Sequence, residues 1–232
     1  MTAAPPVARP RPRPGWTELV VGLLTAAVLA VGLTRLVAPA VDPTTFGLFL
    51  MLLSAIACGG GFALAVLVRI RTVAAFAIRR TSPRWLLLGL AGGVLAFAVK
   101  FPLTSLYVVL SGDTANPQAD WSTAAASGVL PLTLSLLFLG VLTPIGEELL
   151  FRGLVATVLL RYGTIVGVVG SAVIFAVLHG APITMLAAVV VGLIAGELRR
   201  RSDSVLPGVA VHIVFNLLSN VLAFVVVPVL AS

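Results

Sequence analysis

Residues 128–161 read GVLPLTLSLLFLGVLTPIGEELLFRGLVATVLLR, and this stretch decides the fold. It is long and apolar, yet it contains three charged residues in its interior, Glu147, Glu148 and Arg152, besides Arg161 at its end. A helix of this length is roughly 50 Å long, more than the ~30 Å hydrocarbon core of a bilayer. The stretch therefore predicts two membrane spans divided at Pro144, or one long span that bends there because proline lacks the helical N–H.

The distribution of basic residues favours the single span. Arginines cluster in the N-terminal tail, at 69–84, at Arg161 and at 199–201, whereas segment 111–127 has no Lys or Arg. Basic residues gather on the cytoplasmic side of a membrane protein. Two spans would place 199–201 opposite the other clusters, and one span places all of them on the same side. We therefore predict one kinked crossing and a cytoplasmic N-terminus.

The composition excludes the other broad classes of protein. Of 232 residues, 59% are hydrophobic and 10% are charged, against about 45–50% and 25% in soluble domains. One cysteine, Cys58, cannot form a disulfide scaffold. The net charge is +7, but no basic stripe with interleaved aromatics predicts a nucleic-acid partner. The expected partner of the surface is the lipid bilayer.

We predict an all-α polytopic transmembrane bundle with seven spans, or eight if 128–161 or the last run divides, the latter near Pro228. The other apolar runs are 17–37, 45–68, 84–110, 163–179, 182–198 and 205–230.

Three regions follow from this pattern. Residues 1–16 are expected to be a disordered cytoplasmic Pro/Arg tail, 17–127 N-terminal transmembrane helices, and 128–232 the part that carries chemistry. The run after the tail resembles a signal peptide, but its ~20 residues suffice to span a bilayer, so an uncleaved span is favoured. The Arg-, Ala- and Val-rich composition favours a bacterial protein of the plasma membrane.

Polar residues within the C-terminal apolar runs indicate a buried polar site. One ionised residue at the centre of a membrane helix costs roughly 2.5–3.5 kcal/mol even on a lenient scale. Several such groups in a short stretch therefore require a shared polar cavity. The residues concerned are Glu147, Glu148, Arg152, His179, His212 and Asn216. By contrast, Arg35 and Lys100 are isolated, and we interpret both as side chains that extend towards an interface.

The spacing of these residues assigns them to common helix faces. Glu148 and Arg152 are four apart and can form an ion pair. Glu147 is rotated by about 100° and stays free of that arginine, as a general base requires. Each such pair alone is also typical of contacts between helices. Together they favour a functional site, because two further pairs repeat the spacing: Phe175 with His179 and His212 with Asn216.

These motifs resemble the CPBP family, the CAAX-protease and bacteriocin-processing group of intramembrane glutamic endopeptidases, also called the Abi family. Its signature is EExxxR, then FxxxH, then HxxxN or HxxxD. The sequence has all three in order, at 147–152, 175–179 and 212–216, and the resemblance covers roughly 143–217.

The resemblance implies roles for individual residues. Glu147 would activate the attacking water, His179 would help to hold it, and His212 with Asn216 would stabilise the oxyanion. Supporting roles fall to Glu148, Arg152 and Phe175. The implied reaction is hydrolysis of a membrane-associated protein or peptide, by C-terminal CAAX-type trimming or by leader processing, without a cofactor.

Two alternatives stay open at this point. Glu147, His179 and His212 are residue types that ligate zinc, although no HExxH motif is present and Asn216 suits an oxyanion better. A non-catalytic immunity, scaffold or proton-coupled transport protein is the other alternative. The arginine distribution predicts that the cavity opens to the cytoplasm. The glycines at 59–61 fit helix contacts within the chain or between chains. The oligomeric state therefore stays open.

Overall fold

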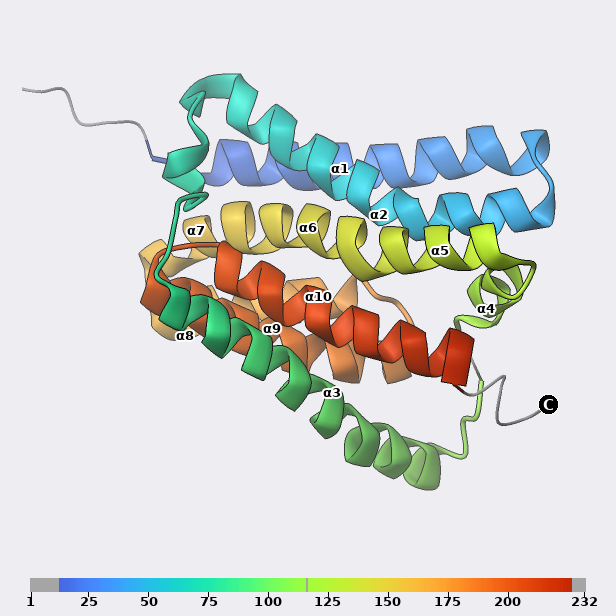
Figure 1. Ribbon diagram of the computed structural model, residues 1–232. Helices are drawn as coiled ribbons and strands as arrows, with labels where there is room; N and C mark the ends of the chain where they lie inside the picture. Colours follow the sequence, from blue (N-terminus) through green and yellow to red (C-terminus); the bar gives the residue numbers. More distant parts are fainter. Residues whose placement is uncertain (1–12, 116, 227–232) are drawn as a thin grey trace, which may run out of the picture.

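The computed structural model describes residues 13–115 and 117–226, and this part of the chain forms helices without a strand (Figure 1). The all-α prediction is confirmed. The helices are α1 (Trp16–Val37), α2 (Pro43–Ala65), α3 (Pro83–Ser111), α4 (Ala119–Ala125), α5 (Val129–Leu137), α6 (Thr143–Glu148), α7 (Ala156–Leu159), α8 (Thr164–Val177), α9 (Pro182–Ser202) and α10 (Leu206–Val221).

Local sequence signals fix several helix ends. Before α2, the carboxylate of Asp42 accepts hydrogen bonds from the N–H groups of Thr44 and Thr45 at 3.0 and 3.1 Å. Pro43 occupies the first helical position, where a missing N–H costs nothing. Gly112, with φ of +69°, ends α3 in the left-handed conformation that glycine adopts most readily.

The stretch that decides the fold is one continuous helical run, Val129–Tyr162. It includes α5, α6 and α7, joined by π-helical segments at Phe138–Leu142 and Leu149–Val155. Pro144 is the second residue of α6, which begins directly after the first of these wide turns. The run is thus continuous, as the single crossing predicts, and its irregularity near Pro144 takes the form of a π-helical turn.

Six helical runs in the described residues are long and apolar enough to cross a membrane. The predicted span at 163–179 is present as α8, a shorter apolar helix of 14 residues, about 21 Å long at 1.5 Å per residue. Pro144 does not divide its run into two spans. Residues 1–12 of the predicted tail and Pro228 lie outside the described residues.

The helices run lengthwise through the bundle, and their connections lie at its two ends (Figure 1). The two ends differ in charge. The connection 71–82, α7 and the start of α10 lie at one end, which carries the arginines of 69–84, Arg161 and 199–201. The turn 38–42 and α4 lie at the other. This is the segregation that the single crossing predicts.

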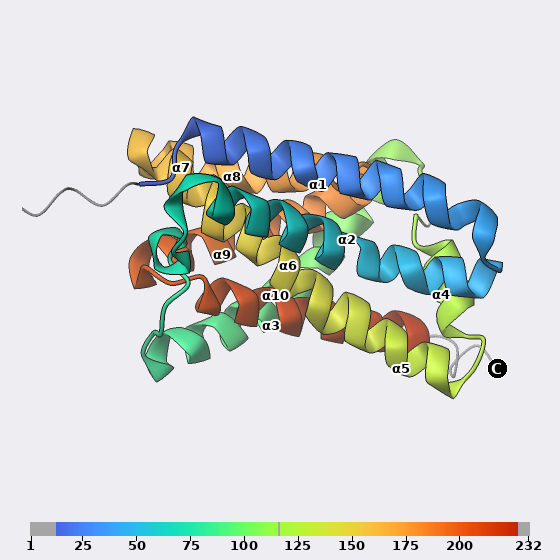
Figure 2. The same ribbon diagram turned by 90° about the horizontal axis from the view of Figure 1, so that it is seen from above.

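Helix α6 occupies the centre of the bundle. It packs between α2 and α10, as the view from above shows (Figure 2). The run that contains the di-glutamate motif is therefore covered on both sides by apolar helices.

Small residues bring α1 close to α2. A Cβ added at Gly61 would overlap the carbonyl oxygen of Gly22, and one added at Gly60 would approach Leu29 to 2.6 Å. The glycines at 60 and 61 therefore serve a helix contact within the chain, which places α1 beside the run that carries the site.

Candidate active site

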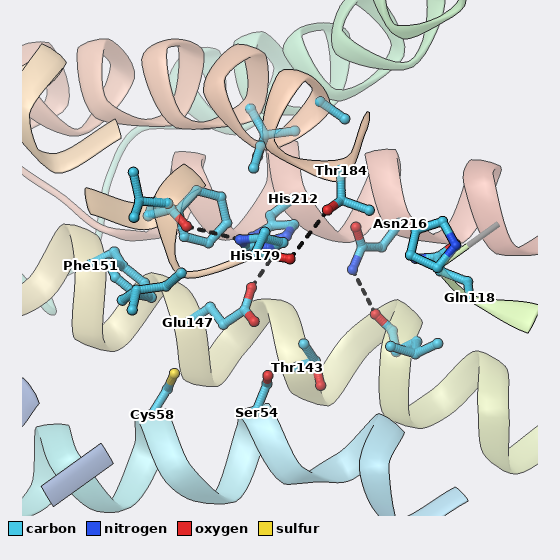
Figure 3. A pocket seen from close by; sticks show the side chains of 18 of the residues that line it. Ser54, Cys58, Gln118, Thr143, Glu147, Phe151, His179, Thr184, His212 and Asn216 are labelled. Atoms are coloured by element: carbon cyan, nitrogen blue, oxygen red, sulfur yellow. Dashed lines mark hydrogen bonds and ion pairs between the residues drawn. The ribbon is translucent and has the colours of Figure 1, made fainter. Parts of the chain in front are cut away.

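A cavity of about 1220 Å³ lies within the bundle and collects the predicted site residues. Glu147, His179, His212 and Asn216 all line it, and Figure 3 shows them facing a common space. They come from three separate parts of the chain: α6, the turn after α8, and α10. The structure therefore brings together the residues that the spacing assigned to separate helix faces.

Glu148 is the buried anchor of the site. Its side chain is fully buried, and Oε1 lies 3.2 Å from Nη1 of Arg152, which is also fully buried. The same oxygen accepts a hydrogen bond from Nδ1 of His212 at 3.2 Å. A Cβ added at Gly208 would lie 2.5 Å from the other carboxylate oxygen, Oε2. The expected i,i+4 pair is present, and the glycine of α10 makes room for it.

Glu147 takes the position expected of a free carboxylate. It is 6% exposed, and its side chain points into the cavity (Figure 3). Its Oε2 lies 3.7 Å from Nε2 of His212. The imidazole of His212 therefore bridges the two neighbouring carboxylates, with Nδ1 directed to Glu148 and Nε2 to Glu147.

The hydrogen bond of His179 fixes its tautomer. Nδ1 lies 2.8 Å from the carbonyl oxygen of Phe175. A carbonyl only accepts hydrogen bonds, so Nδ1 carries the hydrogen and the neutral ring keeps its lone pair on Nε2. His179 therefore offers Nε2 as an acceptor or ligand.

Phe175 holds the polar groups of the site in place. Its buried ring contacts His179 and His212 edge to face, with centroids 4.6 and 5.5 Å apart. The guanidinium carbon of Arg152 lies 4.6 Å from the same ring centroid. An aromatic face attracts a cation, and such contacts strengthen where water is excluded. One phenylalanine thus touches three of the site's charged or titratable side chains.

Asn216 is held by the backbone of the long run. Its Nδ2 donates to the carbonyl oxygen of Leu139 at 2.8 Å. The amide nitrogen has two hydrogens, so this bond leaves a second donor. Asn216 therefore keeps the capacity to donate into the cavity.

Several cavity residues escaped the sequence analysis because no motif marks them. Ser54 and Cys58 face Glu147 from α2, and Thr184 and Gln118 lie on the opposite side (Figure 3). Lys100, expected to extend towards an interface, instead lines the cavity. The one sequence signal that could have assigned Lys100 to the cavity is its charge within an apolar run.

The cavity reaches the end of the bundle opposite the arginines. Its lining includes Thr114, Pro117 and Trp121 from the segment around α4. The expected opening of the cavity to the cytoplasm stays a prediction. At the arginine-rich end, the buried Arg199 donates to the carbonyl of Arg152 at 3.3 Å and to Thr157 Oγ1 at 2.9 Å.

The predicted zinc ligands do not form a metal-binding group. Across the described parts of the chain, no three His, Cys, Asp or Glu side chains are arranged to hold a metal ion. Zinc binding by Glu147, His179 and His212 stays an alternative that experiment must decide.

A comparison with protein families matches residues 129–218 to the type II CAAX prenyl endopeptidase Rce1-like family. Residues 129–218 are therefore similar to the Rce1-like family. The Rce1-like segment contains all three motifs, and the resemblance drawn from them is confirmed. This match indicates a membrane protease of the CAAX type in general, and the six apolar helical runs in the described residues fit a multi-pass membrane protein. No curated protein and no solved structure matches the chain.

Helices α1 to α3 lie outside the Rce1-like segment. They still contribute to the cavity, with Leu23 from α1, Cys58 from α2 and Lys100 from α3. The cavity is thus shared between the matched segment and the helices that precede it.

Proposed function

We propose that the chain is an intramembrane endopeptidase in which Glu147 activates water to hydrolyse a peptide bond. The observation that carries the proposal is the unequal environment of two adjacent carboxylates. Glu148 is fully buried and paired with Arg152, whereas Glu147 lies in the cavity beside His212. Such a division leaves one acid as a fixed charge and the other available for proton transfer.

Water activation needs two acceptors at one place. A water between Glu147 and His179 donates one hydrogen to the carboxylate and the other to the Nε2 lone pair. Glu147 takes its proton as the hydroxide attacks the carbonyl carbon of the substrate. A positioned general base contributes typically 10²- to 10⁴-fold in rate.

The oxyanion that forms then needs hydrogen-bond donors. Asn216 supplies the second hydrogen of its amide, and His212 donates from Nε2 in its imidazolium form. A donor of this kind is worth about 3–4 kcal/mol in a water-poor site. Glu147 finally returns its proton to the leaving amine, and the C–N bond breaks.

The remaining motif residues position this machinery. Arg152 neutralises Glu148, and Glu148 orients His212 through Nδ1. Phe175 packs against Arg152 and both imidazoles. These three side chains act through their neighbours and need not touch the substrate.

The substrate is a membrane-associated protein or peptide that enters the cavity between the helices, for CAAX-type C-terminal trimming or for leader processing. We place the enzyme in the bacterial plasma membrane with the arginine-rich end and the N-terminus in the cytoplasm, following the positive-inside rule. The cavity then extends towards the outer face, where the α4 segment lies.

The test compares Glu147→Gln with a matched substitution, Glu197→Gln. Glu197 lies on α9 and pairs with Arg200 and Arg201 outside the cavity. Membrane peptides are quantified in cells that carry the wild type or either variant. Peptide fragments that accumulate with wild type and Glu197→Gln, but not with Glu147→Gln, support the proposal. Normal processing by Glu147→Gln contradicts it and favours a scaffold or immunity role.

A further inference from the structure

Lys100 and Asn220 offer unused hydrogen-bond donors to the cavity, which both side chains line. Nζ of Lys100 donates to Oγ of Ser219 at 3.0 Å, and an ammonium has two further hydrogens. Asn220 follows Ser219 directly on α10, so its side chain lies at the same level of the bundle. It is 6% exposed, and its buried Nδ2 has no hydrogen-bond partner in the described structure.

The ammonium of Lys100 also lacks a counter-ion. Three aromatic rings surround it at 5.5–5.6 Å from their centroids: Phe97, Phe101 and Phe215. None of the ion pairs found in the described residues includes Lys100. Aromatic rings attract a cation, but a charge taken out of water is normally paired with an opposite charge. An anion in the cavity would accept hydrogen bonds from both Lys100 and Asn220.

The cavity around these donors suits a hydrocarbon chain. It crosses the bundle from α3 to α1, which lie on opposite sides in Figure 1. The part of the lining that α1 supplies is entirely aliphatic: Leu23, Leu24, Ala26, Ala27 and Ala30. A hydrocarbon chain needs no hydrogen bonds there, whereas a peptide brings an N–H and a carbonyl at nearly every residue.

The cavity is accessible from the side of the bundle. Leu24 of α1 and Val177 and Leu178 at the end of α8 line it, and they are 61%, 56% and 64% exposed. In a membrane, this side of the bundle faces lipid. A lipid chain can therefore enter the cavity without passing through water.

The depth of Lys100 distinguishes between kinds of anionic lipid. It is 11 residues from the nearer end of α3, which is Ser111, or roughly 16 Å along the helix. Phosphates of phospholipids lie at the membrane surface, beyond the hydrocarbon core. A lipid with one chain and a small carboxylate head can place its charge at this depth, and a phospholipid headgroup does not reach it.

We propose that the cavity binds a single-chain carboxylate lipid of the class of a long-chain fatty acid. The carboxylate accepts hydrogen bonds from Nζ of Lys100 and Nδ2 of Asn220, and the chain lies along the aliphatic lining towards α1. A lipid bound in this way occupies space that Glu147 also lines, so it excludes a peptide from the cavity. The site itself does not depend on peptide hydrolysis.

Photolabelling of the purified full chain in phosphatidylcholine nanodiscs tests the proposal. The probes are palmitic acid with a diazirine near the end of its chain and the methyl ester of the same molecule. We expect the acid to label wild type at least about 10-fold more than the ester, because the ester forfeits the charge-assisted hydrogen bonds. Mass spectrometry should place the label on α1 or α8, and an excess of unlabelled palmitate should suppress it.

Substitutions at the donors should change the ratio of acid to ester labelling. Lys100→Met should lower the acid to the level of the ester and leave the ester unchanged, whereas Lys100→Arg keeps the charge and should retain the preference. Asn220→Leu should reduce the ratio by less. Arg35→Met is the matched control, because Arg35 is a cation of the apolar helix α1 outside the cavity lining, and it should label as wild type does.

Several outcomes would overturn the proposal. Equal labelling of wild type by acid and ester shows that no carboxylate is recognised, and this result decides the question even if Lys100→Met fails to fold. An equal loss of both probes in Lys100→Met shows a merely structural lysine. Competition by phosphatidylglycerol as strong as that by palmitate assigns the site to a phospholipid headgroup. Equally strong competition by a short apolar peptide with a free carboxylate assigns it to a peptide.

Discussion

The side-chain amide of Asn216 donates to the carbonyl of Leu139, at 2.8 Å. In the π-helical turn Phe138–Leu142, the N–H of Thr143 bonds five residues back, to Phe138. The next bond of this pattern would join Pro144 to Leu139, but proline has no N–H. Asn216 supplies the missing donor. The proline of the long run and the asparagine of the third motif therefore form one structural unit, one turn before Glu147.

Replacing Asn216 by leucine should cost both stability and activity. The Leu139 carbonyl would lose its donor within the membrane, at a cost of about 1–3 kcal/mol. The free energy of unfolding in detergent measures this loss, and kcat/KM should fall by at least 10²-fold because an oxyanion donor disappears.

Asn220→Leu is the matched control. Asn220 lies one turn further along α10 and lines the same cavity, but its Nδ2 makes no hydrogen bond within the described structure. Its replacement should leave stability near that of wild type. Equal destabilisation by both substitutions would contradict the role assigned to the Leu139 bond.

Gly208→Ala should inactivate the enzyme by displacing Glu148. The added methyl would lie 2.5 Å from Glu148 Oε2, so the carboxylate must move away from His212. We expect kcat to fall at least 10-fold. Gly59→Ala is the control, because a Cβ there meets no atom within 4 Å. Full activity in Gly208→Ala would show that Glu148 does not position His212.

The sequence predicted this site through periodicity and charge. Glu148 and Arg152 are paired because a four-residue spacing on a helix fixes their geometry. The same logic placed Phe175 against His179. The arginine clusters also favoured one membrane crossing over two at 129–162. An additional crossing would move every later segment, with its arginines, to the other side of the membrane.

Contacts between distant segments gave no such signal. Lys100 meets Ser219 across 119 positions, and no local pattern relates them. Asn216 was assigned from its motif, but its bond to Leu139 depends on a π-helical turn that hydropathy does not reveal. The extent of the cavity towards α4 likewise follows from how the helices pack.

Arg152→Met should lower the free energy of unfolding of the protein. Arg152 and Glu148 are both fully buried, and removing one partner of a buried ion pair typically costs about 3–5 kcal/mol because a charge is left uncompensated. Thermal unfolding in detergent should show this loss. The double variant with Glu148→Gln should regain most of the stability but no activity. Additive losses in the double variant would mean that the two side chains do not interact.

Removal of metal ions should leave peptide hydrolysis intact. Among the described residues, no three His, Cys, Asp or Glu side chains are arranged to hold a metal ion. In the proposed mechanism Glu147 generates the nucleophile without a Lewis acid. Activity of the purified chain is therefore measured before and after prolonged dialysis against 1,10-phenanthroline, followed by zinc addition. A thermolysin-type zinc protease treated in parallel confirms that the chelator is effective. Activity that disappears with the chelator and returns with zinc would assign the three side chains as metal ligands and replace the glutamate mechanism.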